Sequence, residues 1–381
     1  MRYLNAGVWI IATAAIVFGL YVGRDILAPL ALAAFLWLII EAFARLMQTH
    51  IPVLPRSLTQ VLAVLLIMSG AIAVIVIFVD GLDEFAKNAG AYETRINALI
   101  RETYARFNLT SSSVEPPTLS ALLFNQENTR FVQPILDSVQ GLASSFVLIL
   151  IYIAFLFMAE TAWPQKLDEV FKDQASRDAA REVSARVRKS MEEYLWVQTL
   201  ISIIITVFTY ITLSVLGLDN ALFWAFIVFF LNYIPTIGSI VAAFLPGFFA
   251  LAQPDWPSYM PADPTLCALI VFLAVSVWQF VIGNFVQPRL MGETLNLSSL
   301  VVLISLAVWG AIWGIPGMFL SAPLTVLMMI LLAQTPGARW IAILLSADGH
   351  PVKPAYMMHD DENNALEEAD LPGSSAVKIS D

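Results

Sequence analysis

Two groups of polar and helix-breaking residues lie inside the most apolar parts of this 381-residue chain. The first group is Asn232, Pro235 and Gly238, in the stretch LNYIPTIGSIVAAFLPG. The second lies in the stretch WGAIWGIPG and comprises Gly310, Gly314, Pro316 and Gly317. Proline removes an amide donor and clashes with the preceding turn, and glycine lets the backbone turn. Both groups therefore predict broken helices, and the peptide groups freed at a break can bind a small polar solute or an ion.

Three side-chain amides follow the first group, in the next apolar run. Gln279, Asn284 and Gln287 recur at intervals of five and three residues. On a helix, Asn284 and Gln287 share a face, and Gln279 lies about 140° from Asn284. Amides buried in a membrane either bond to neighbouring helices or line a polar cavity. Both interpretations stay open here, and the three amides join the candidate pathway residues.

One carboxylate, Glu41, lies inside an apolar run, and Arg45 follows four residues later on the same helical face. An ionisable residue at membrane depth is a candidate for function. Glu41 and Arg45 are therefore candidates for ion coupling, and a structural ion pair near the cytoplasmic interface is the alternative. No predicted span carries an unmistakable carboxylate at mid-depth, which weakens a proton- or sodium-coupled mechanism.

The other reactive residues exclude most enzyme classes. The three histidines lie in a loop or in the C-terminal tail, and the single cysteine lies in an apolar run. The chain has no glycine-rich phosphate loop, nucleophile elbow or metal-ligand spacing. We therefore expect no enzyme activity, no metal and no cofactor. The net charge of −10 argues against nucleic-acid binding, which requires clustered cations.

Membrane helices are the elements that would position these residues. Hydrophobic residues make up 59% of the chain, charged residues make up 13%, and the mean hydropathy is +0.76. Several uncharged runs exceed the ~18 residues that span a bilayer. The fold class is therefore an all-α polytopic membrane protein with about eight membrane segments. These segments lie near residues 6–22, 26–47, 58–80, 139–162, 194–217, 218–252, 263–286 and 298–333.

The charge pattern divides the chain into four parts. Residues 1–80 hold N-terminal membrane helices, and residues 81–138 form an amphipathic insert outside the cytoplasm. Residues 139–335 form the membrane domain, which includes a basic amphipathic insert at 164–193. The acidic tail, residues 336–381, is expected to be disordered. The excess of Lys and Arg places the 164–193 insert and both chain termini in the cytoplasm.

Two segments, 218–252 and 298–333, are too long for one simple span and are broken near the middle. Each has about 35 residues, or ~50 Å of helix. One interpretation is a kinked, tilted helix, and the other is a pair of half-helices that re-enters the membrane and returns to the same face. We favour the second, because residues 194–252 would then form an inverted copy of residues 263–333, a plan common in transporters. The solute pathway would lie between the two breaks.

The sequence resembles the autoinducer-2 exporter family, bacterial membrane proteins also called PerM-type permeases. The resemblance is carried by LNYIPTIGSIVAAFLPG, by NFVQPRLMGETLNLSSLVVLISLAVWGAIWGIPGMFLSAPLTVLMMI and by LAPLALAAFLWLII…PRSLTQVLAVLL. It extends over nearly the whole chain to about residue 335. It implies a bacterial inner-membrane location, homo-oligomers, export of autoinducer-2 in some members and sodium or lithium exchange for protons in others. Relatives often have a His-Pro pair where this chain has LNLSSL after Gly292, so any role of that histidine is absent here.

Together, these residues and the resemblance predict a secondary transporter that exports a small polar solute such as the quorum-sensing signal autoinducer-2. A sodium(lithium)/proton antiporter that uses Glu41 is the alternative. A non-transporting membrane scaffold is the alternative from another class. The expected partners are the lipid bilayer, a small polar solute or a monovalent cation, and further copies of the chain.

Overall fold

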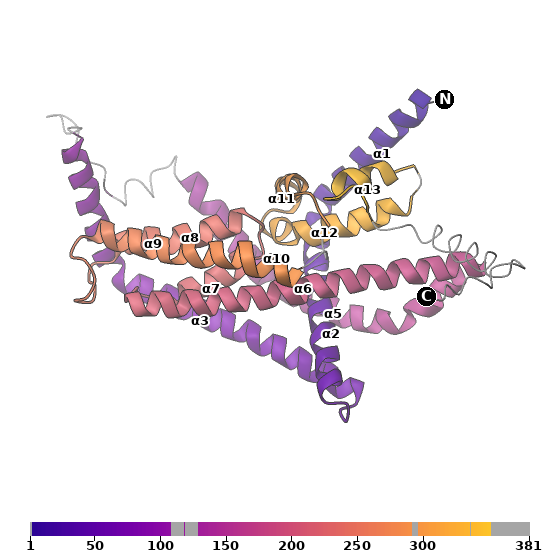
Figure 1. The fold of residues 1–381 in the computed structure, drawn as a ribbon, viewed down its shortest axis with the longest axis horizontal. Coiled ribbons are helices and arrows are strands. Elements are labelled where there is room, and N and C mark those ends of the chain that lie inside the picture. The colour runs from indigo at the N-terminus through magenta and orange to yellow at the C-terminus, as the bar shows by residue number, and fades with distance from the viewer. Residues whose placement is uncertain (1, 108–117, 119–128, 292–295, 336, 352–381) are drawn as a thin grey trace, which may run out of the picture.

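The computed structural model describes residues 2–107, 118, 129–291, 296–335 and 337–351 (Figure 1). Apart from one isolated β-bridge, between Leu297 and Ser346, the regular structure of these residues is helical. The helices are α1 (Arg2–Val22), α2 (Arg24–His50), α3 (Arg56–Arg106), α5 (Thr129–Val170), α6 (Gln174–Leu216), α7 (Ala221–Leu231), α8 (Ile237–Ala252), α9 (Pro264–Val281), η1 (Ile282–Val286), α10 (Gln287–Met291), α11 (Ser299–Trp313), α12 (Ile315–Ala333) and α13 (Arg339–Leu345).

Five helical stretches in the described part of the chain are long and apolar enough to cross a membrane. They are α2, α3, α6, α12 and the continuous stretch Pro264–Met291. Four shorter apolar stretches accompany them, namely Phe146–Glu160, α7, α8 and α11. Helices α7, α8 and α11 have fewer than the ~20 residues that a bilayer requires, whereas Phe146–Glu160 is part of the 42-residue α5. The chain is therefore an all-helical protein with several apolar spans, and its three short apolar helices need partners.

Local sequence explains where several helices begin and end. The side chain of Asp173 accepts a hydrogen bond from the amide of Ser176 and so caps the N-terminus of α6. Hydrogen bonding to the side chain of Ser176, and then to its amide, lowers the pKa of the exposed Asp173 carboxyl. Gly217 ends α6 in the left-handed conformation, with φ of 76°. Pro264 lies in the first turn of α9, where a proline is tolerated.

Three helices continue across the boundaries that the charge pattern suggested. Helix α3 runs for 51 residues without a break at residue 80, where the first membrane part was expected to end. Helices α5 and α6, of 42 and 43 residues, similarly join the apolar segments to the amphipathic insert at 164–193. Amphipathic and fully apolar stretches both have a helical periodicity, so a change of solvent along the helix need not interrupt it.

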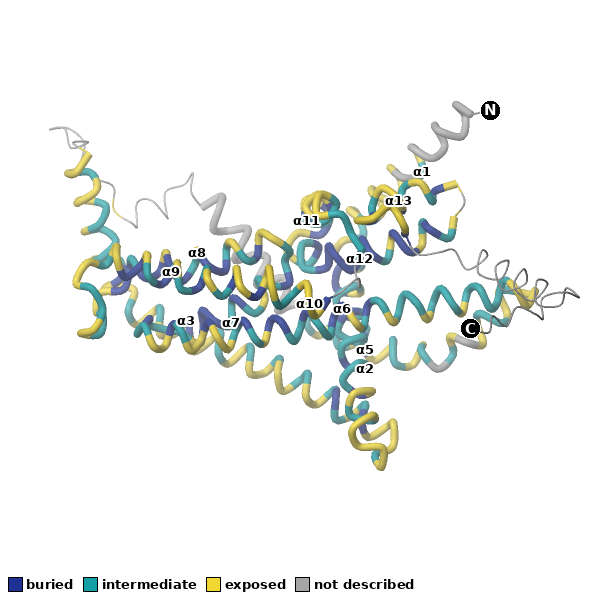
Figure 2. Tube along the Cα trace, in the orientation of Figure 1, coloured by how far each residue is buried: buried dark blue, intermediate teal, exposed yellow. Residues whose placement is uncertain are grey.

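Figure 2 shows that α3 is exposed along most of its length, while α6, α8 and α9 hold many buried residues. In the apolar window of α3, 6% of the residues are buried. Large apolar side chains such as Leu65, Ile72 and Val76 are at least half exposed in the single chain. Such a surface requires lipid or another apolar partner around it.

The first broken segment is a helical hairpin, which we call hairpin 1: α7, the tip at residues 232–236, and α8. The ring centroids of Trp224 and Phe249 lie 5.0 Å apart, whereas a continuous helix would separate these positions by roughly 37 Å. At the open end, the buried Gln253 accepts a hydrogen bond from the amide of Asp219 and donates one to the carbonyl of Gly217. Helices α7 and α8 thus fold back on each other.

The second broken segment is also a hairpin, hairpin 2: α11, the tip at Gly314, and α12. The indole Nε1 of Trp309 donates to Oγ1 of Thr325 at 3.2 Å, across the break. At the open end, Leu297 packs in one cluster with Val326 and Ile330 of α12. Both breaks therefore turn the chain back, and the kinked, continuous helix is wrong for both segments.

Helix α6 shows that the two hairpins run in opposite directions (Figure 1). Hairpin 1 opens beside the C-terminal end of α6, at Gly217. Hairpin 2 opens beside Met191, near the middle of the same helix. Each tip lies between these two ends, because Tyr233 and Leu320 share a cluster with Leu195.

The C-terminal region differs from the expected disordered tail at its start. Residues 339–345 form α13, whose Ala342 packs against Met329 and Ala333 of α12. The apolar sequence RWIAILL explains this helix, because it can bury one face on α12. Residues 352–381 of the acidic tail, and most of the expected loop around 108–128, lie outside the described residues.

Candidate functional site

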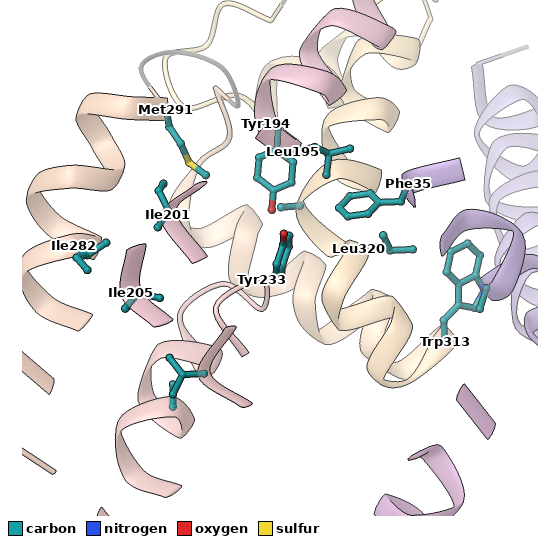
Figure 3. Packing of buried hydrophobic residues seen from close by; sticks show 14 of the residues in the cluster. Phe35, Tyr194, Leu195, Ile201, Ile205, Tyr233, Ile282, Met291, Trp313 and Leu320 are labelled. Carbon is teal, nitrogen blue, oxygen red and sulfur yellow. The ribbon is translucent and has the colours of Figure 1, made fainter. Parts of the chain in front are cut away.

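The tip of hairpin 1 packs against the first turns of α12 in the largest buried cluster of the described residues. The ring of Tyr233, from this tip, stacks on the ring of Phe319, with centroids 4.6 Å apart. Figure 3 shows Tyr233 on the same side of the cluster as Leu320 and Phe35, while Trp313, beside the tip of hairpin 2, lies further along the cluster. The structure therefore places the first break against α12, two residues beyond the second group of helix-breaking residues.

The tip of hairpin 1 is held by a polar face of α6. Nε2 of Gln198 donates to the carbonyl of Asn232 at 2.7 Å, and Nδ2 of Asn232 donates to Oγ of Ser202 at 2.9 Å. The hydroxyls of Thr199 and Tyr233 are hydrogen-bonded at 2.8 Å. Gln198 and Ser202 are buried, so these bonds satisfy polar groups that lipid could not. Asn232 thus binds the tip of hairpin 1 to α6 through hydrogen bonds of both its backbone and its side chain.

The residue after Pro235 carries backbone strain. Thr236 has φ of 61° and ψ of −61°, a conformation that a β-branched residue rarely adopts. It lies in an exposed part of the tip, directly before α8. Strained backbone of this kind is concentrated at functional sites, because the surrounding structure must hold it in place.

Replacing Thr236 by glycine should relieve this strain. The relief of ~1–3 kcal/mol should exceed the ~0.5–1 kcal/mol entropic cost of glycine. We expect Thr236→Gly to raise the thermal unfolding midpoint in detergent, followed by the fluorescence of the purified protein. The control is Thr94→Gly, in the regular helix α3, which should lower the midpoint. A Thr236→Gly protein less stable than the wild type would contradict the strained turn.

The tip of hairpin 2 turns at a glycine and is anchored on α1. Gly314 has φ of 66° and ψ of −140°, which side-chain-bearing residues essentially do not adopt. Nε1 of Trp313 donates to the carbonyl of Leu20 at 3.1 Å. Gly310, one helical turn before the tip, is covered by the side chain of Met318. The two tips are therefore attached to different parts of the protein, hairpin 1 to α6 and hairpin 2 to α1.

A second glycine closes each hairpin at an equivalent position. A Cβ atom at Gly238 would lie 1.8 Å from the carbonyl oxygen of Leu231, in the last turn of α7. A Cβ atom at Gly317 would lie 1.9 Å from the carbonyl oxygen of Trp309, in α11. Both contacts are with backbone atoms, which cannot rotate away. Each tip therefore requires the absence of a side chain at this position.

Each tip leads into the N-terminus of a helix, α8 in hairpin 1 and α12 in hairpin 2. Among the described residues, the amides of Thr236, Ser239, Ile315 and Gly317 donate to no backbone carbonyl outside the helices. The first turn of a helix leaves such amides without a partner in the helix and carries a partial positive charge. The two tips thus offer hydrogen-bond donors to oxygen atoms of a solute.

The three amides after hairpin 1 do not form one polar cluster. Gln279 is buried, and its Nε2 has no partner among the described residues. Asn284 is exposed and donates to the carbonyl of Phe280, within its own helix. Gln287 contacts the sulfur of Met291 at 3.6 Å. The π-helix η1 separates Gln279 from Gln287 and changes the angle between their side chains, which the α-helical spacing did not anticipate.

Glu41 lies in an arginine network rather than in a single ion pair. Its carboxylate is 1% exposed and lies 3.0 Å from Nη2 of Arg56 and 3.3 Å from Nη2 of Arg188. The expected partner, Arg45, is more distant, at 3.6 Å. Gln60 donates to the second carboxylate oxygen of Glu41. Glu41 is thus buried and paired, in a different place from the hairpin tips.

Several residues of the site were missed by sequence reasoning. Gln198, Thr199 and Ser202 hold the tip of hairpin 1, and Gln253 closes its open end. The first three form a polar face on an apolar helix, at helical spacing, and that pattern could have identified them. Gln253 had no comparable signal, because it lies after a helix end beside several polar residues.

These features define a helical membrane protein of the transporter type, with two oppositely directed hairpins that pack against each other near the tip of hairpin 1. A family model described as AI-2E family transporter matches residues 10–337. The chain therefore belongs to the AI-2E transporter family, and it is a membrane transporter.

Curated relatives support this assignment over most of their length. The chain is 28% identical over 328 residues to the AI-2 transport protein TqsA of Escherichia coli strain K12, covering 86% of this chain and 91% of the relative. It is 24% identical over 359 residues to a sodium-lithium/proton antiporter of Halobacillus andaensis, covering 89% and 98% respectively. The named activities of these relatives differ, so the family alone does not identify the solute.

Proposed function

We propose that this transporter exports a small, oxygen-rich polar solute, of the autoinducer-2 type, along a pathway between the tips of hairpins 1 and 2. The observation that carries the proposal is the stack of Tyr233 on Phe319, which places the tip of hairpin 1 against the first turns of α12 in hairpin 2. The amides in the first turns of α8 and α12 would donate hydrogen bonds to the solute. The AI-2 transport protein TqsA, with 28% identity, supports the solute class.

Export would require one hairpin to move relative to the other. Hairpin 1 is bonded to α6, and hairpin 2 is bonded to α1 through Trp313. Because the two hairpins open in opposite directions, separation of the tips toward one side or the other would expose the solute to one face of the membrane at a time. This arrangement also supports the inverted repeat of residues 194–252 and 263–333.

Ion exchange is the weaker proposal, although the antiporter from Halobacillus andaensis is also a relative. A coupling carboxylate must release its partner to bind a proton or a cation. Glu41 contacts three arginines, whose positive charges occupy the carboxylate and repel a metal cation. We therefore assign Glu41 and Arg45 to a structural network.

The test is efflux from proteoliposomes loaded with autoinducer-2, other small polar metabolites, or sodium and lithium ions. Asn232→Ala removes the hydrogen bond to Ser202 and should lower the initial efflux rate about tenfold. A tenfold lower rate corresponds to an activation free energy that is ~1.4 kcal/mol higher. The matched control is Asn284→Ala, an exposed amide that bonds only within its own helix, and it should retain the wild-type rate.

Three results would contradict the proposal. Equal efflux by Asn232→Ala and wild type, at equal protein incorporation, would remove the pathway from hairpin 1. Efflux of sodium or lithium alone, coupled to proton uptake, would replace the polar solute by a cation. No flux of any solute by the wild type would favour the membrane scaffold.

A further inference from the structure

A second cavity lies away from the hairpin tips, between α2, α3, α5 and α6. Its volume is about 1450 Å³, which exceeds the roughly 300–1,000 Å³ of ordinary small-molecule sites. One part of its lining is charged and includes Glu41, Arg56, Glu160 and Arg188. The other part is apolar and includes Val61, Leu65, Leu156 and Phe157. A cavity with these two parts suits an amphiphile with a charged head and an apolar chain.

The three arginines of the charged part pair with three carboxylates, of which Glu41 and Glu160 line the cavity and Glu192 lies behind the lining. Arg56 and Arg188 both contact Glu160 at 3.1 Å, in addition to Glu41. Glu192 contacts Arg45 at 3.1 Å and Arg188 at 2.8 Å. The three carboxylates and the three guanidinium groups therefore balance. A head group with a net charge would leave one charge unpaired in this partly buried place, whereas a zwitterion would not.

An arginine and a glutamate of the cavity lining each keep atoms that can form further hydrogen bonds. The ion pairs of Arg56 run through Nη2, so Nε and Nη1 remain as donors, and the side chain is 61% exposed. Both contacts of Glu160 use Oε1, so Oε2 remains as an acceptor. Trp163, which also lines the cavity and is 52% exposed, offers an aromatic face to a cation.

The positions of these residues along their helices match the level of lipid head groups. Glu160 ends the apolar stretch Phe146–Glu160, and Arg56 begins α3, directly before its apolar window. Glu41 and Arg45 lie in the C-terminal half of α2. Helices α2, α3 and α5 thus place polar residues at one level, next to exposed apolar side chains such as Val61 and Leu65.

We propose that this cavity binds a zwitterionic phospholipid with a primary amine, of the phosphatidylethanolamine type. Arg56 donates to the phosphate, and Glu160 accepts from the ammonium group, beside the ring of Trp163. An acyl chain lies along Val61, Leu65 and Leu156. This site is separate from the solute pathway, so the lipid is a structural ligand of the α2–α3–α5–α6 junction.

The experiment is native mass spectrometry of the purified, delipidated full-length protein, titrated with lipids of identical acyl chains. Wild type should bind phosphatidylethanolamine about tenfold more tightly than phosphatidylglycerol. A tenfold ratio of dissociation constants corresponds to the free energy of one charge-assisted hydrogen bond. Phosphatidylcholine, whose ammonium group has no hydrogen to donate, should bind more weakly as well. Glu160→Gln should remove the preference for phosphatidylethanolamine.

Further variants keep the test decisive. Val61→Trp fills the apolar part without touching the ion pairs, and it should weaken binding of all three lipids. Arg181→Gln is the control, because it breaks an ion pair with Asp168 outside the cavity lining. If Glu160→Gln does not fold, Val61→Trp and the lipid series still decide the result.

The proposal is overturned by any of three outcomes. The first is equal or tighter binding of phosphatidylglycerol by wild type. The second is unchanged phosphatidylethanolamine binding in Val61→Trp. The third is binding of glycerophosphoethanolamine, which has no acyl chains, as tightly as of the intact lipid, because the ligand would then be a soluble head group.

Discussion

Gly238→Ala is expected to abolish folding of hairpin 1. The added methyl group would lie 1.8 Å from the carbonyl oxygen of Leu231, and neither atom can move without opening the tip. Overpacking against a rotatable side chain typically costs ~1–3 kcal/mol, so a clash with backbone should cost roughly 3 kcal/mol or more. Gly317→Ala should have the same effect on hairpin 2, where the oxygen of Trp309 is 1.9 Å away.

The matched controls are glycines that have open space around them. A Cβ atom at Gly70 or Gly283 meets nothing within 4 Å. Gly70→Ala, in the regular helix α3, should even stabilise the protein by about 0.5–1 kcal/mol. The measurement is the yield of monodisperse protein in detergent and its thermal midpoint. If Gly238→Ala behaves like Gly70→Ala, the tight turn described for hairpin 1 is incorrect.

Glu41→Gln is expected to destabilise the junction of α2, α3, α5 and α6 much more than Arg45→Gln. Removing one partner of a buried ion pair costs ~3–5 kcal/mol, and we expect about 2–3 kcal/mol here because exposed arginines can recover some hydration. Arg45 is 45% exposed and lies 3.6 Å from Glu41, so its loss should cost less than ~1 kcal/mol.

Thermal unfolding of both variants, in the same detergent, checks this difference. If both variants lose equal stability, the pair of Glu41 and Arg45 is the main interaction of the network. Transport measurements add a second criterion. If Glu41 couples ions, Glu41→Gln should fold normally and lose the dependence of transport on the proton gradient.

The sequence predicted the broken helices for a physical reason. Proline and glycine act on the backbone of their own turn, so Pro235, Gly238 and Gly314 identify breaks without any knowledge of the fold. The same residues also require that protein covers the break, because lipid offers no hydrogen bonds. That requirement led to the prediction that a pathway lies between the two breaks, and Tyr233 of the first break contacts Phe319, just beyond the second.

The partners of the buried polar groups could not be predicted in this way. Helical spacing identifies neighbours three and four residues apart, so it paired Glu41 with Arg45. The closer arginines, Arg56 and Arg188, belong to other helices, and their approach depends on how the helices pack. The same limit applies to Gln198 and Asn232, which lie 34 residues apart.

Local helix type was a further source of error. The shared face of Asn284 and Gln287 was inferred from a regular α-helix, but residues 282–286 form a π-helix. One wider turn rotates the side chains that follow it, about the helix axis, relative to the side chains that precede it. Hydrophobic periodicity does not reveal a single wider turn, because the surrounding residues are apolar on all sides.

The length of α3 has a consequence for how the protein can be observed. Its 51 residues correspond to a contour of roughly 75 Å, more than twice the ~30 Å hydrocarbon layer. Phe85 and Tyr92, in the half beyond the apolar window, pack on Phe249 of hairpin 1. Any displacement of that hairpin would therefore move this half of α3, so a spectroscopic label near residue 106 would report the displacement.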